Sequence, residues 1–452
     1  EAAPLLSKDF VNAHFEFRNK FMSGQPEQRT REKRAISFAE NQLGESTGRL
    51  YVAEYFPAES KAKMEELVAN LRTALSHRID GLSWIGAETK AAAQEKLRKF
   101  TVKIGYPDKW RDYSGLEVRA DDLVGNAERK GLFEWNYDLA RLNEPVDKDE
   151  WGMTPQTVNA YYNPLQNEIV FPAAILQPPF FDPKADEATN YGGIGAVIGH
   201  EMTHGYDDQG SRFGPDGNFN NWWTPADAKG FAARSARLVE QFDGYQAAPG
   251  LRVNGKLTLG ENIADLGGLA TAYDAMRLAV GDTPDPNTDG LSRDQRFFYS
   301  FATSWRDRYT PDMLKVLVNS DPHAPSDFRA IGAPSRSMRA SKSSCVVSAK
   351  KPRAVPTKPR GKSDGRARKL RGALVKSKRR CVRRCATSRW TRFSKRVSQP
   401  MKPASARIRR DRLSRSAPAN APSARRTTKI SRRVCTRVGT RHDGRMMMTT
   451  HP

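Results

Sequence analysis

The feature that most constrains this 452-residue chain is the stretch V-I-G-H-E-M-T-H-G at 197–205, which holds the pattern H-E-x-x-H inside an apolar run. On an α-helix, residues four apart lie on one face, so His200 and His204 can direct their imidazoles at one ion, with Glu201 beside them. Two neutral imidazoles and a carboxylate that accepts a proton from water are the donor set of a zinc hydrolase. The pattern alone also fits a surface helix that carries two histidines by chance.

A second stretch, G-E-N-I-A-D at 260–265, supplies what a catalytic zinc further needs. Such a zinc has three protein ligands and an open fourth position, and Glu261 can be the third ligand. Asp265 lies four residues on, on the same helix face, and can accept a hydrogen bond from the free N–H of a ligand histidine. Acidic residues also favour the first turn of any helix. Together, however, the two stretches predict a site for one Zn²⁺ per chain.

The formal net charge of +24 invites a nucleic-acid interpretation, but the charge is uneven. Residues 338–452 hold 36 Lys and Arg, three Asp and no Glu, whereas residues 1–337 hold 39 basic and 48 acidic side chains. The chain therefore combines an acidic body with a basic tail. The body is long enough for a substantial hydrophobic core.

All four cysteines lie in the tail, at positions 345, 381, 385 and 435. The body can therefore have neither a disulfide framework nor a thiolate metal site. No apolar run reaches the length of a membrane span. The first residue is Glu, so we expect any targeting segment to be missing from this chain.

Residues 1–145 predict a mostly helical region, because apolar residues recur there at three-and-four spacing among strong helix formers. The predicted helices cover 8–21, 28–43, 60–79, 86–100 and 120–142. Nothing in this region indicates chemistry, so we interpret it as a wall or lid of a site.

From about residue 155 the pattern changes. Residues 157–162 and 168–171 predict two strands of a hairpin joined by the turn N-P-L-Q-N, with Asn159 on the edge. Helices are then predicted over 190–206, 226–242, 261–278 and 292–308, and a short loop over 323–329. The glycines at 192–199 indicate close helix packing, because their spacing and the lack of a preceding strand do not fit a phosphate loop. The turn D-G-N at 216–218 lacks the ligand series of a calcium loop.

These residues resemble the neprilysin family of zinc metallopeptidases over about 1–337. The matching stretches include V-N-A-Y-Y at 158–162, I-V-F-P-A-A-I-L-Q-P-P-F-F at 169–181 and N-Y-G-G-I-G-A-V-I-G-H-E-M-T-H-G-Y-D-D at 190–208, followed by T-L-G-E-N-I-A-D at 258–265 and H-A-P-S-D-F-R at 323–329. R-L-Y-V-A-E-Y-F and I-G-Y-P-D match in the helical part. Several long motifs in the right order are far more specific than H-E-x-x-H.

The resemblance implies zinc ligation by His200, His204 and Glu261, with Glu201 as general base. Asp265 would orient a ligand histidine. His323 would donate a hydrogen bond to the oxyanion, although a lone loop histidine is more often simply exposed to solvent.

The resemblance also implies substrate-binding roles. Asn159 and Ala160 would hold the peptide backbone as an added strand. Arg329 would bind a carbonyl or carboxylate beyond the scissile bond. The apolar pocket after that bond would be lined by Ile175, Phe180, Val197 and Trp305. The substrates would be oligopeptides, since a helical domain encloses the site.

Two departures from the family pattern stand out. The chain begins inside the family's helical part, so we expect an N-terminally truncated chain. The pattern then stops near residues 335–336, where the basic tail begins. The tail can be a non-specific nucleic-acid arm, an ordinary disordered segment or the product of a shifted reading frame. We favour the shifted frame, because Glu disappears and every cysteine arrives at the same point.

The sequence thus predicts a mainly α fold with a small β-sheet (α+β), a thermolysin-like zincin catalytic domain with a partial helical lid. The predicted domains are 1–145 (helical), 146–337 (catalytic) and 338–452 (basic tail). We expect a zinc-dependent endopeptidase acting on oligopeptides in an extracytoplasmic location, without specific nucleic-acid partners. The alternatives are a catalytically inactive fragment that binds zinc or peptide, and a nucleic-acid-binding protein acting through the tail.

Overall fold

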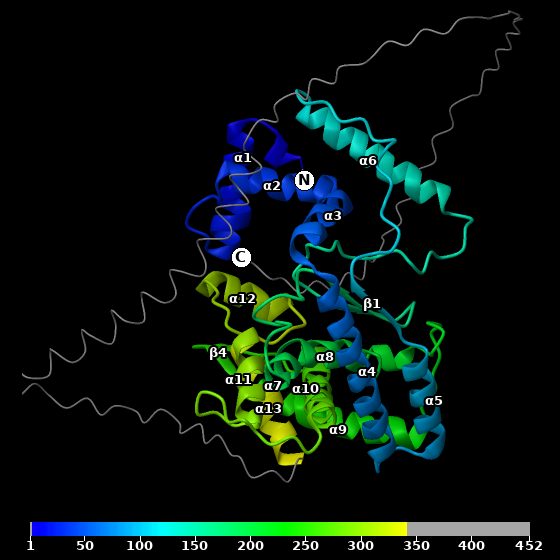
Figure 1. The fold of residues 1–452 in the computed structure, drawn as a ribbon. Helices are drawn as coiled ribbons and strands as arrows, with labels where there is room; N and C mark the ends of the chain where they lie inside the picture. The colour runs from blue at the N-terminus through cyan, green and yellow to red at the C-terminus, as the bar shows by residue number, and fades with distance from the viewer. Residues whose placement is uncertain (1, 341–452) are drawn as a thin grey trace, which may run out of the picture. The chain divides into compact units, whose positions relative to one another are not determined.

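The computed structural model describes residues 2–340, with side chains to residue 334, and has a mainly α fold with a small sheet (Figure 1). The described helices before the sheet hairpin are α1 (Lys8–His14), η2 (Phe15–Phe21, π-helical), α2 (Arg31–Gln42), α3 (Gly44–Tyr55), α4 (Ala58–Gly81), α5 (Ala87–Arg98) and α6 (Leu123–Ala140). Those after it are α7 (Glu187–Asn190), η3 (Tyr191–Gly195, π-helical), α8 (Ala196–His204), α9 (Pro225–Asp243), α10 (Leu259–Val280), α11 (Arg293–Ser304), α12 (Pro311–Ser320) and α13 (Ser326–Ala340). Short 3-10 turns, η1 (Ala3–Leu5) and η4 (Gly210–Arg212), complete the helical set. The cysteines and nearly all of the basic tail lie beyond the described residues.

The five helices predicted in the first 145 residues are present within a few residues of their expected ends. Helix α3 was not predicted, because two glycines, Gly44 and Gly48, weaken its helical pattern. Both glycines are buried, and a Cβ at either position would come within 2.6 Å of a side-chain atom of Thr154 or Pro155. This helix therefore exists through a close tertiary contact that local sequence does not reveal.

The main sheet has three strands in the order β1-β3-β2. The predicted hairpin is present as β2 (Tyr161–Asn163) and β3 (Glu168–Pro172), which pair antiparallel. Strand β1 (Thr101–Gly105), which was not predicted, pairs parallel to β3 in the register Thr101 to Glu168. A second sheet of two short strands, β4 (Gln246–Ala248) and β5 (Leu251–Arg252), lies after α9. Strand β2 is an edge of the main sheet, and its Tyr161 and Tyr162 line a cavity together with residues of the metal helix.

One hydrophobic core runs across the predicted boundary at 145/146. Its buried members come from α4, α5 and β1 as well as from β3, α8, α10 and α11. They include Leu71, Ile104, Phe171, Ile198 and Phe297, each less than a tenth exposed. The helical part and the metal-binding part therefore share a core. Helix α13 likewise runs through the predicted boundary at 337/338.

Helices α8 and α10 cross at two glycines. A Cβ on Gly199 would lie 2.6 Å from the carbonyl oxygen of Gly268, and a Cβ on Gly268 would overlap the backbone of His200. Only glycine at both positions allows the two backbones to touch. Since α8 carries the two histidines and α10 carries Glu261, this contact brings the ligand-bearing helices together.

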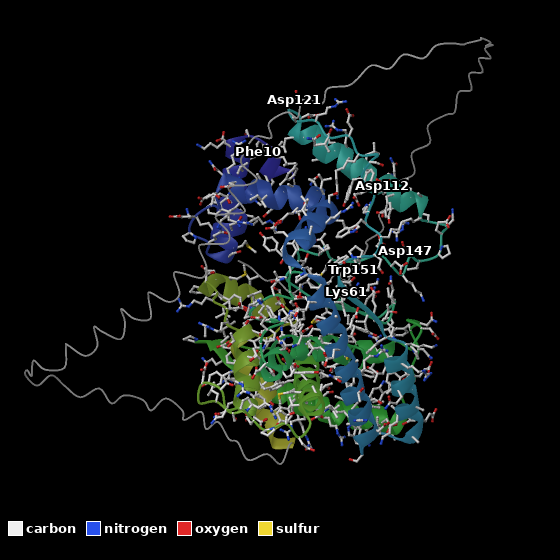
Figure 2. The ribbon with its side chains drawn as sticks, viewed as in Figure 1. Phe10, Lys61, Asp112, Asp121, Asp147 and Trp151 are labelled. Atoms are coloured by element: carbon white, nitrogen blue, oxygen red, sulfur yellow. The ribbon has the colours of Figure 1, made fainter. Side chains whose placement is uncertain are left out.

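The surface of the described residues is mixed, and its side chains are drawn in Figure 2. Helix α6 has no buried residue, and Leu132 and Trp135 on it are more than half exposed. Lys61 and Trp151, both labelled in Figure 2, line one cavity of about 380 Å³ beside β1. Among the described helices, none combines the length and apolarity needed to cross a membrane.

Candidate metal centre

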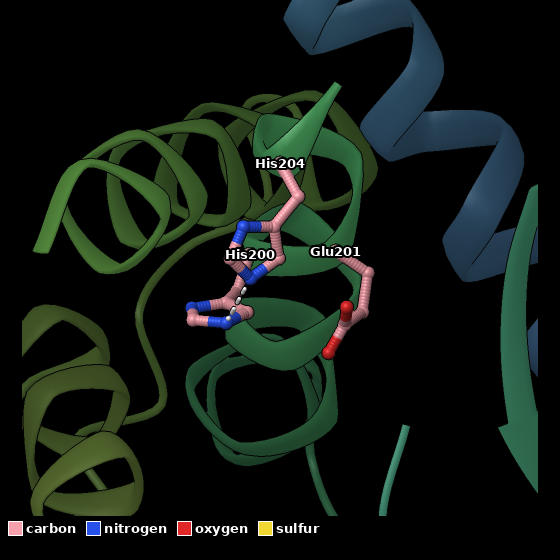
Figure 3. Close-up of side chains that lie close together, drawn as sticks. All are labelled: His200, Glu201 and His204. Atoms are coloured by element: carbon pink, nitrogen blue, oxygen red, sulfur yellow. Dashed lines mark hydrogen bonds between the residues drawn. The ribbon is translucent and has the colours of Figure 1, made fainter. Parts of the chain in front are cut away.

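The predicted metal helix is continuous from α7 through η3 into α8. It buries His200, Glu201 and His204 on its last two turns (Figure 3). Each of the three offers a ligand atom within 4.8 Å of the others. Spacing of four residues places the two imidazole rings at right angles, with centroids 4.5 Å apart. The local sequence thus forms the constellation that H-E-x-x-H predicts.

A carboxylate lies behind each histidine. The Nδ1 of His200 donates a hydrogen bond to Asp265 Oδ1 (2.9 Å), as the sequence predicts. The Nδ1 of His204 donates to Asp207 Oδ2 (2.7 Å), a partner that the sequence analysis missed. Both Nδ1 protons are thereby committed, so the two Nε2 atoms point their lone pairs at a common point, 2.9 Å apart (Figure 3).

Glu261 completes the arrangement from α10. Its Oε2 lies 3.3 Å from His200 Nε2, and its Oε1 lies 3.6 Å from His204 Nε2. Both Glu201 and Glu261 are therefore candidate carboxylate ligands. Glu261 is favoured because its two oxygens face both nitrogens, whereas the carboxylate of Glu201 lies to one side of them (Figure 3).

The donor set fits zinc. Two ligand atoms about 2.1 Å from a tetrahedral zinc lie roughly 3.4 Å apart, and the three donor separations here are 2.9, 3.3 and 3.6 Å. Two imidazole nitrogens at this separation need a shared cation between them, either a proton or a metal ion. Glu261 Oε2 is also buried without a hydrogen bond of acceptable geometry. A buried carboxylate oxygen beside two convergent nitrogens is what a metal ligand provides.

The electrostatics of the centre favour a cation. Burial opposes protonation of His204, but Glu261 and Asp207 outweigh it and raise the pKa of His204 to about 10. Burial also opposes protonation of His200, yet Asp265 and Glu261 raise its pKa. Burial raises the pKa of Glu201, which suits a general base, since an ordinary Glu is too weakly basic.

Arg329 lies on helix α13, which corrects the prediction that 323–329 is a loop. Pro325 and Asp327 are helix-start residues, and the N–H groups of Phe328 and Arg329 already bond to the Pro325 carbonyl. The Arg329 guanidinium binds Asp265 through Nε (2.7 Å) and Nη2 (2.8 Å) and lies 4.0 Å from the ring centroid of Trp305. It is therefore held from two sides.

His323 precedes that helix and is nearly buried. Its Nε2 lies 3.1 Å from Glu261 Oε2, and its Nδ1 donates to Asp321 Oδ1 (2.6 Å). Burial opposes protonation of His323, but Glu261 and Asp321 outweigh this effect and raise the pKa of His323 to about 9. The structure thus brings His323 to the edge of the centre rather than leaving it in solvent.

A cavity of about 430 Å³ opens beside His200. The four apolar residues predicted for the pocket after the scissile bond all line it, together with Asn159 and Arg329: Ile175, Phe180, Val197 and Trp305. Arg329 therefore connects the wall of this cavity, through Asp265, to the ligand His200.

Asn159 and Ala160 are buried next to the same edge but precede strand β2 instead of belonging to it. The N–H of Ala160 donates to the side-chain oxygen of Asn159 (2.9 Å). Such a local side-chain bond competes with strand pairing, which explains why β2 starts at Tyr161. This corrects the prediction of a strand from 157.

Two supporting carboxylates were missed by the sequence analysis, Asp207 and Asp321. Asp207 follows His204 by three residues, the spacing at which side chains meet on a helix. Asp321 precedes His323 by two. Each signal was visible but weak, because acidic residues at such spacings are common on any surface.

The chain matches two models of peptidase family M13, over residues 1–107 and 159–344. It is 38% identical over 338 residues to an endothelin-converting enzyme homolog of Locusta migratoria, covering 72% of this chain and 46% of that protein. It is 38% identical over 341 residues to mouse neprilysin, with 72% and 45% covered. The chain thus spans about half the length of the curated relatives that it matches.

The comparison with solved structures points to the same family. The fold is similar to the Mycobacterium tuberculosis zinc metalloprotease Zmp1 bound to an inhibitor, with a TM-score of 0.71, 48% identity, and 74% of this chain and 51% of that one covered. It is also similar to PepO of Lactobacillus rhamnosis, with a TM-score of 0.68, 35% identity, and 73% and 51% covered. Since both models of the family match, and the second matched region contains the histidine pair, the chain belongs to peptidase family M13, the neprilysin family of zinc metallopeptidases.

Proposed function

We propose that this chain is a zinc-dependent endopeptidase that hydrolyses oligopeptides. The observation that carries the proposal is the convergence of both histidine Nε2 atoms and the Glu261 carboxylate, backed by Asp265 and Asp207. His200, His204 and Glu261 would hold one zinc ion. When bound, zinc supplies a Lewis acid that polarises the peptide carbonyl and makes water a stronger acid.

Glu201 would act as the general base. It is buried beside the histidines but is not needed to bind the ion, so its carboxylate can accept a proton from the attacking water and pass it to the leaving amine. Its raised pKa brings its basicity closer to that required near neutral pH.

His323 would stabilise the charge that develops on the carbonyl oxygen. Its side chain is fixed by Asp321 and its Nε2 reaches the centre, so its donor is already oriented before the reaction. One fixed donor of this kind is typically worth about 3 kcal/mol of transition-state stabilisation.

The peptide backbone would bind along the free edge of β2. Asn159 and Ala160 lie at the start of that edge, and Arg329 lies across the cavity. The apolar cavity lined by Ile175, Phe180, Val197 and Trp305 would take the side chain after the scissile bond, which favours large apolar residues at that position.

The first alternative is a catalytically inactive fragment that binds zinc or peptide, because the chain spans about half of its relatives. The second is nucleic-acid binding by the basic tail. Nearly all of the tail lies outside the described residues, so this second alternative rests on the charge of the tail alone. Family membership and the cysteine-free body support an extracytoplasmic location, which cell fractionation would test.

The test is cleavage of a fluorogenic oligopeptide by the purified chain, compared with Glu201→Gln. We expect zinc-dependent cleavage that a chelator abolishes. Glu201→Gln should lower kcat by about 10²- to 10⁴-fold or more and still bind one zinc per chain, because glutamine cannot accept the proton. Zinc binding without any cleavage by the wild-type chain would support the inactive-fragment alternative instead.

A further inference from the structure

A second, smaller cavity of about 100 Å³ lies beside Glu201 and His204, and it is not the apolar cavity described above. It is lined along β2 by Tyr161 and Tyr162, and on the opposite side by Gly210 and Phe213. A peptide that adds to the β2 edge in the antiparallel direction runs from Tyr162 toward Asn159. The small cavity would then receive the side chain before the scissile bond, and the 430 Å³ cavity the side chain after it.

The outer wall of the small cavity is the loop that follows the metal helix, residues 207–213. This loop is held by a buried lysine from a distant helix. Lys96, on α5, is fully buried, and its Nζ donates to the carbonyl oxygens of Gly210 and Phe213, both at 2.7 Å. Both carbonyls that Lys96 binds therefore belong to loop residues that line the cavity.

The same contact reaches the metal centre. The N–H of Gly210 donates to Asp207 Oδ1 (2.6 Å), and the other oxygen of Asp207 accepts the bond from His204. Lys96 Nζ also lies 5.7 Å from the ring centroid of Tyr162, on the opposite wall of the cavity. One side chain thus contacts both walls and is linked to His204 through three successive hydrogen bonds, by way of Gly210 and Asp207.

Burying a lysine costs free energy, and the contacts that the lysine makes must offset this cost. A purely apolar side chain of the same length would fill the space but leave the carbonyls of Gly210 and Phe213 without this donor. We propose that Lys96 is a positioning residue that fixes the 207–213 loop, keeps the small cavity narrow and thereby selects peptides with a small residue before the scissile bond. This inference rests on the proposed function only for the identity of the ligand.

The experiment measures binding, so that it does not depend on turnover. Zinc-loaded wild-type chain, Lys96→Met and Lys103→Met are titrated by fluorescence anisotropy with two non-hydrolysable peptides. Both peptides carry a reduced bond and Leu after it, and they differ only in Ala or Phe before it. Lys103 is the matched control, because it is also a buried lysine but does not contact the loop. Its Nζ is ion-paired to Glu168 at 2.7 Å.

We expect the wild-type chain to bind the Ala peptide at least about tenfold more tightly than the Phe peptide. In Lys96→Met the difference should shrink to about threefold or less, while Lys103→Met keeps the wild-type ratio. Hydrogen exchange at the Gly210 amide should speed up at least about tenfold in Lys96→Met only. This second measurement reports the loop without any peptide.

The proposal is overturned if the wild-type chain does not distinguish the two peptides or binds neither, if Lys96→Met keeps the wild-type ratio, or if Lys103→Met loses it equally. If Lys96→Met does not fold, Phe213→Ala provides the test instead. This variant widens the small cavity and leaves both carbonyl contacts of Lys96 in place. A Phe peptide that gains no affinity in this variant contradicts the proposal. Cleavage by the wild-type chain is scored separately and tests the proposed function alone.

Discussion

Behind each ligand histidine stands a carboxylate, and the two carboxylates come from different parts of the chain. Asp265 reaches His200 from α10, whereas Asp207 reaches His204 from the next turn of its own segment. A carboxylate in this position fixes the ring orientation and makes the other nitrogen a better ligand. Asp207, which the sequence analysis missed, thus makes the same kind of contact to His204 as the predicted Asp265 makes to His200.

Replacing Asp207 with Asn should raise the zinc dissociation constant about 10- to 100-fold, because the amide polarises the His204 ring less and disturbs the loop that it caps. Competition with a chromophoric chelator measures this change. Asp321→Asn is the matched control, since it alters the same kind of pair at His323, which we do not assign as a ligand. Equal losses in both variants would contradict a specific role for Asp207.

Lys96 also predicts a pH dependence of stability. Burial lowers its pKa to about 7, partly offset by Asp207, from 10.5 in an unfolded chain. Between these pH values the unfolded chain binds one more proton, so the free energy of unfolding rises with pH, by up to about 1.4 kcal/mol per unit. The facing rings of Tyr162 and Tyr206 do not titrate in this window, since burial raises both of their pKa values.

Below about pH 7 the lysine is protonated in both states, so the free energy of unfolding no longer changes with pH through this group. Urea unfolding of the wild-type chain and Lys96→Met between pH 6.5 and 9.5 would test the prediction. The stability difference between the two proteins should change in favour of the wild-type chain as pH rises. A difference that is constant across this range would show that Lys96 keeps its charge.

At the scale of elements, the sequence predicts most helices because their apolar spacing is strong. It predicts the metal helix and the helix of Glu261 for the same reason. It misses α3 and β1, whose structure depends on partners more than fifty residues away. It misses the helical start at Ser326, although Pro325 and Asp327 were available as signals. Local sequence patterns therefore locate the candidate metal ligands, but they do not reveal the tertiary contacts that fix the positions of these side chains.

The crossing of α8 and α10 gives the prediction that belongs to this scale. Gly199→Ala should destabilise the chain by about 1–3 kcal/mol, because the new methyl group meets the backbone of α10. Gly131→Ala, in the middle of α6, meets no atom within 4 Å and should stabilise that helix by about 0.5–1 kcal/mol. Thermal unfolding of both variants, with zinc titration of Gly199→Ala, provides the comparison. Unchanged stability of Gly199→Ala would mean that the helices can separate at no cost.

At the scale of the whole molecule, the main core joins both halves of the described chain, and the first half supplies one strand of the main sheet. Strand β1 pairs with β3, whose Ile169, Val170 and Phe171 are fully buried. Residues 146–340 expressed alone would expose this strand and the face that α4 covers. An uncovered strand of this kind promotes association between chains. The main core thus contains residues from both sides of the predicted boundary at 145/146.

We expect residues 146–340 to aggregate or to lack a cooperative thermal transition when expressed alone. Co-expression with residues 1–145 as a separate chain should restore both a soluble complex and zinc binding, since the break falls in an exposed segment. Size-exclusion chromatography and circular dichroism measure these outcomes. A soluble, cooperatively melting 146–340 fragment would show that β1 and α4 are dispensable.

The contact between Gly199 and Gly268 has a consequence for redesign of the centre. With no side chain at the crossing, the helices are already as close as two backbones can be, and any substitution there can only push them apart. Main-chain atoms consequently set the shortest distance that is possible between the histidine pair and the Glu261 carboxylate. Adapting the centre to a smaller ion would therefore have to be done by changing the ligand side chains, because the helices themselves cannot move closer together.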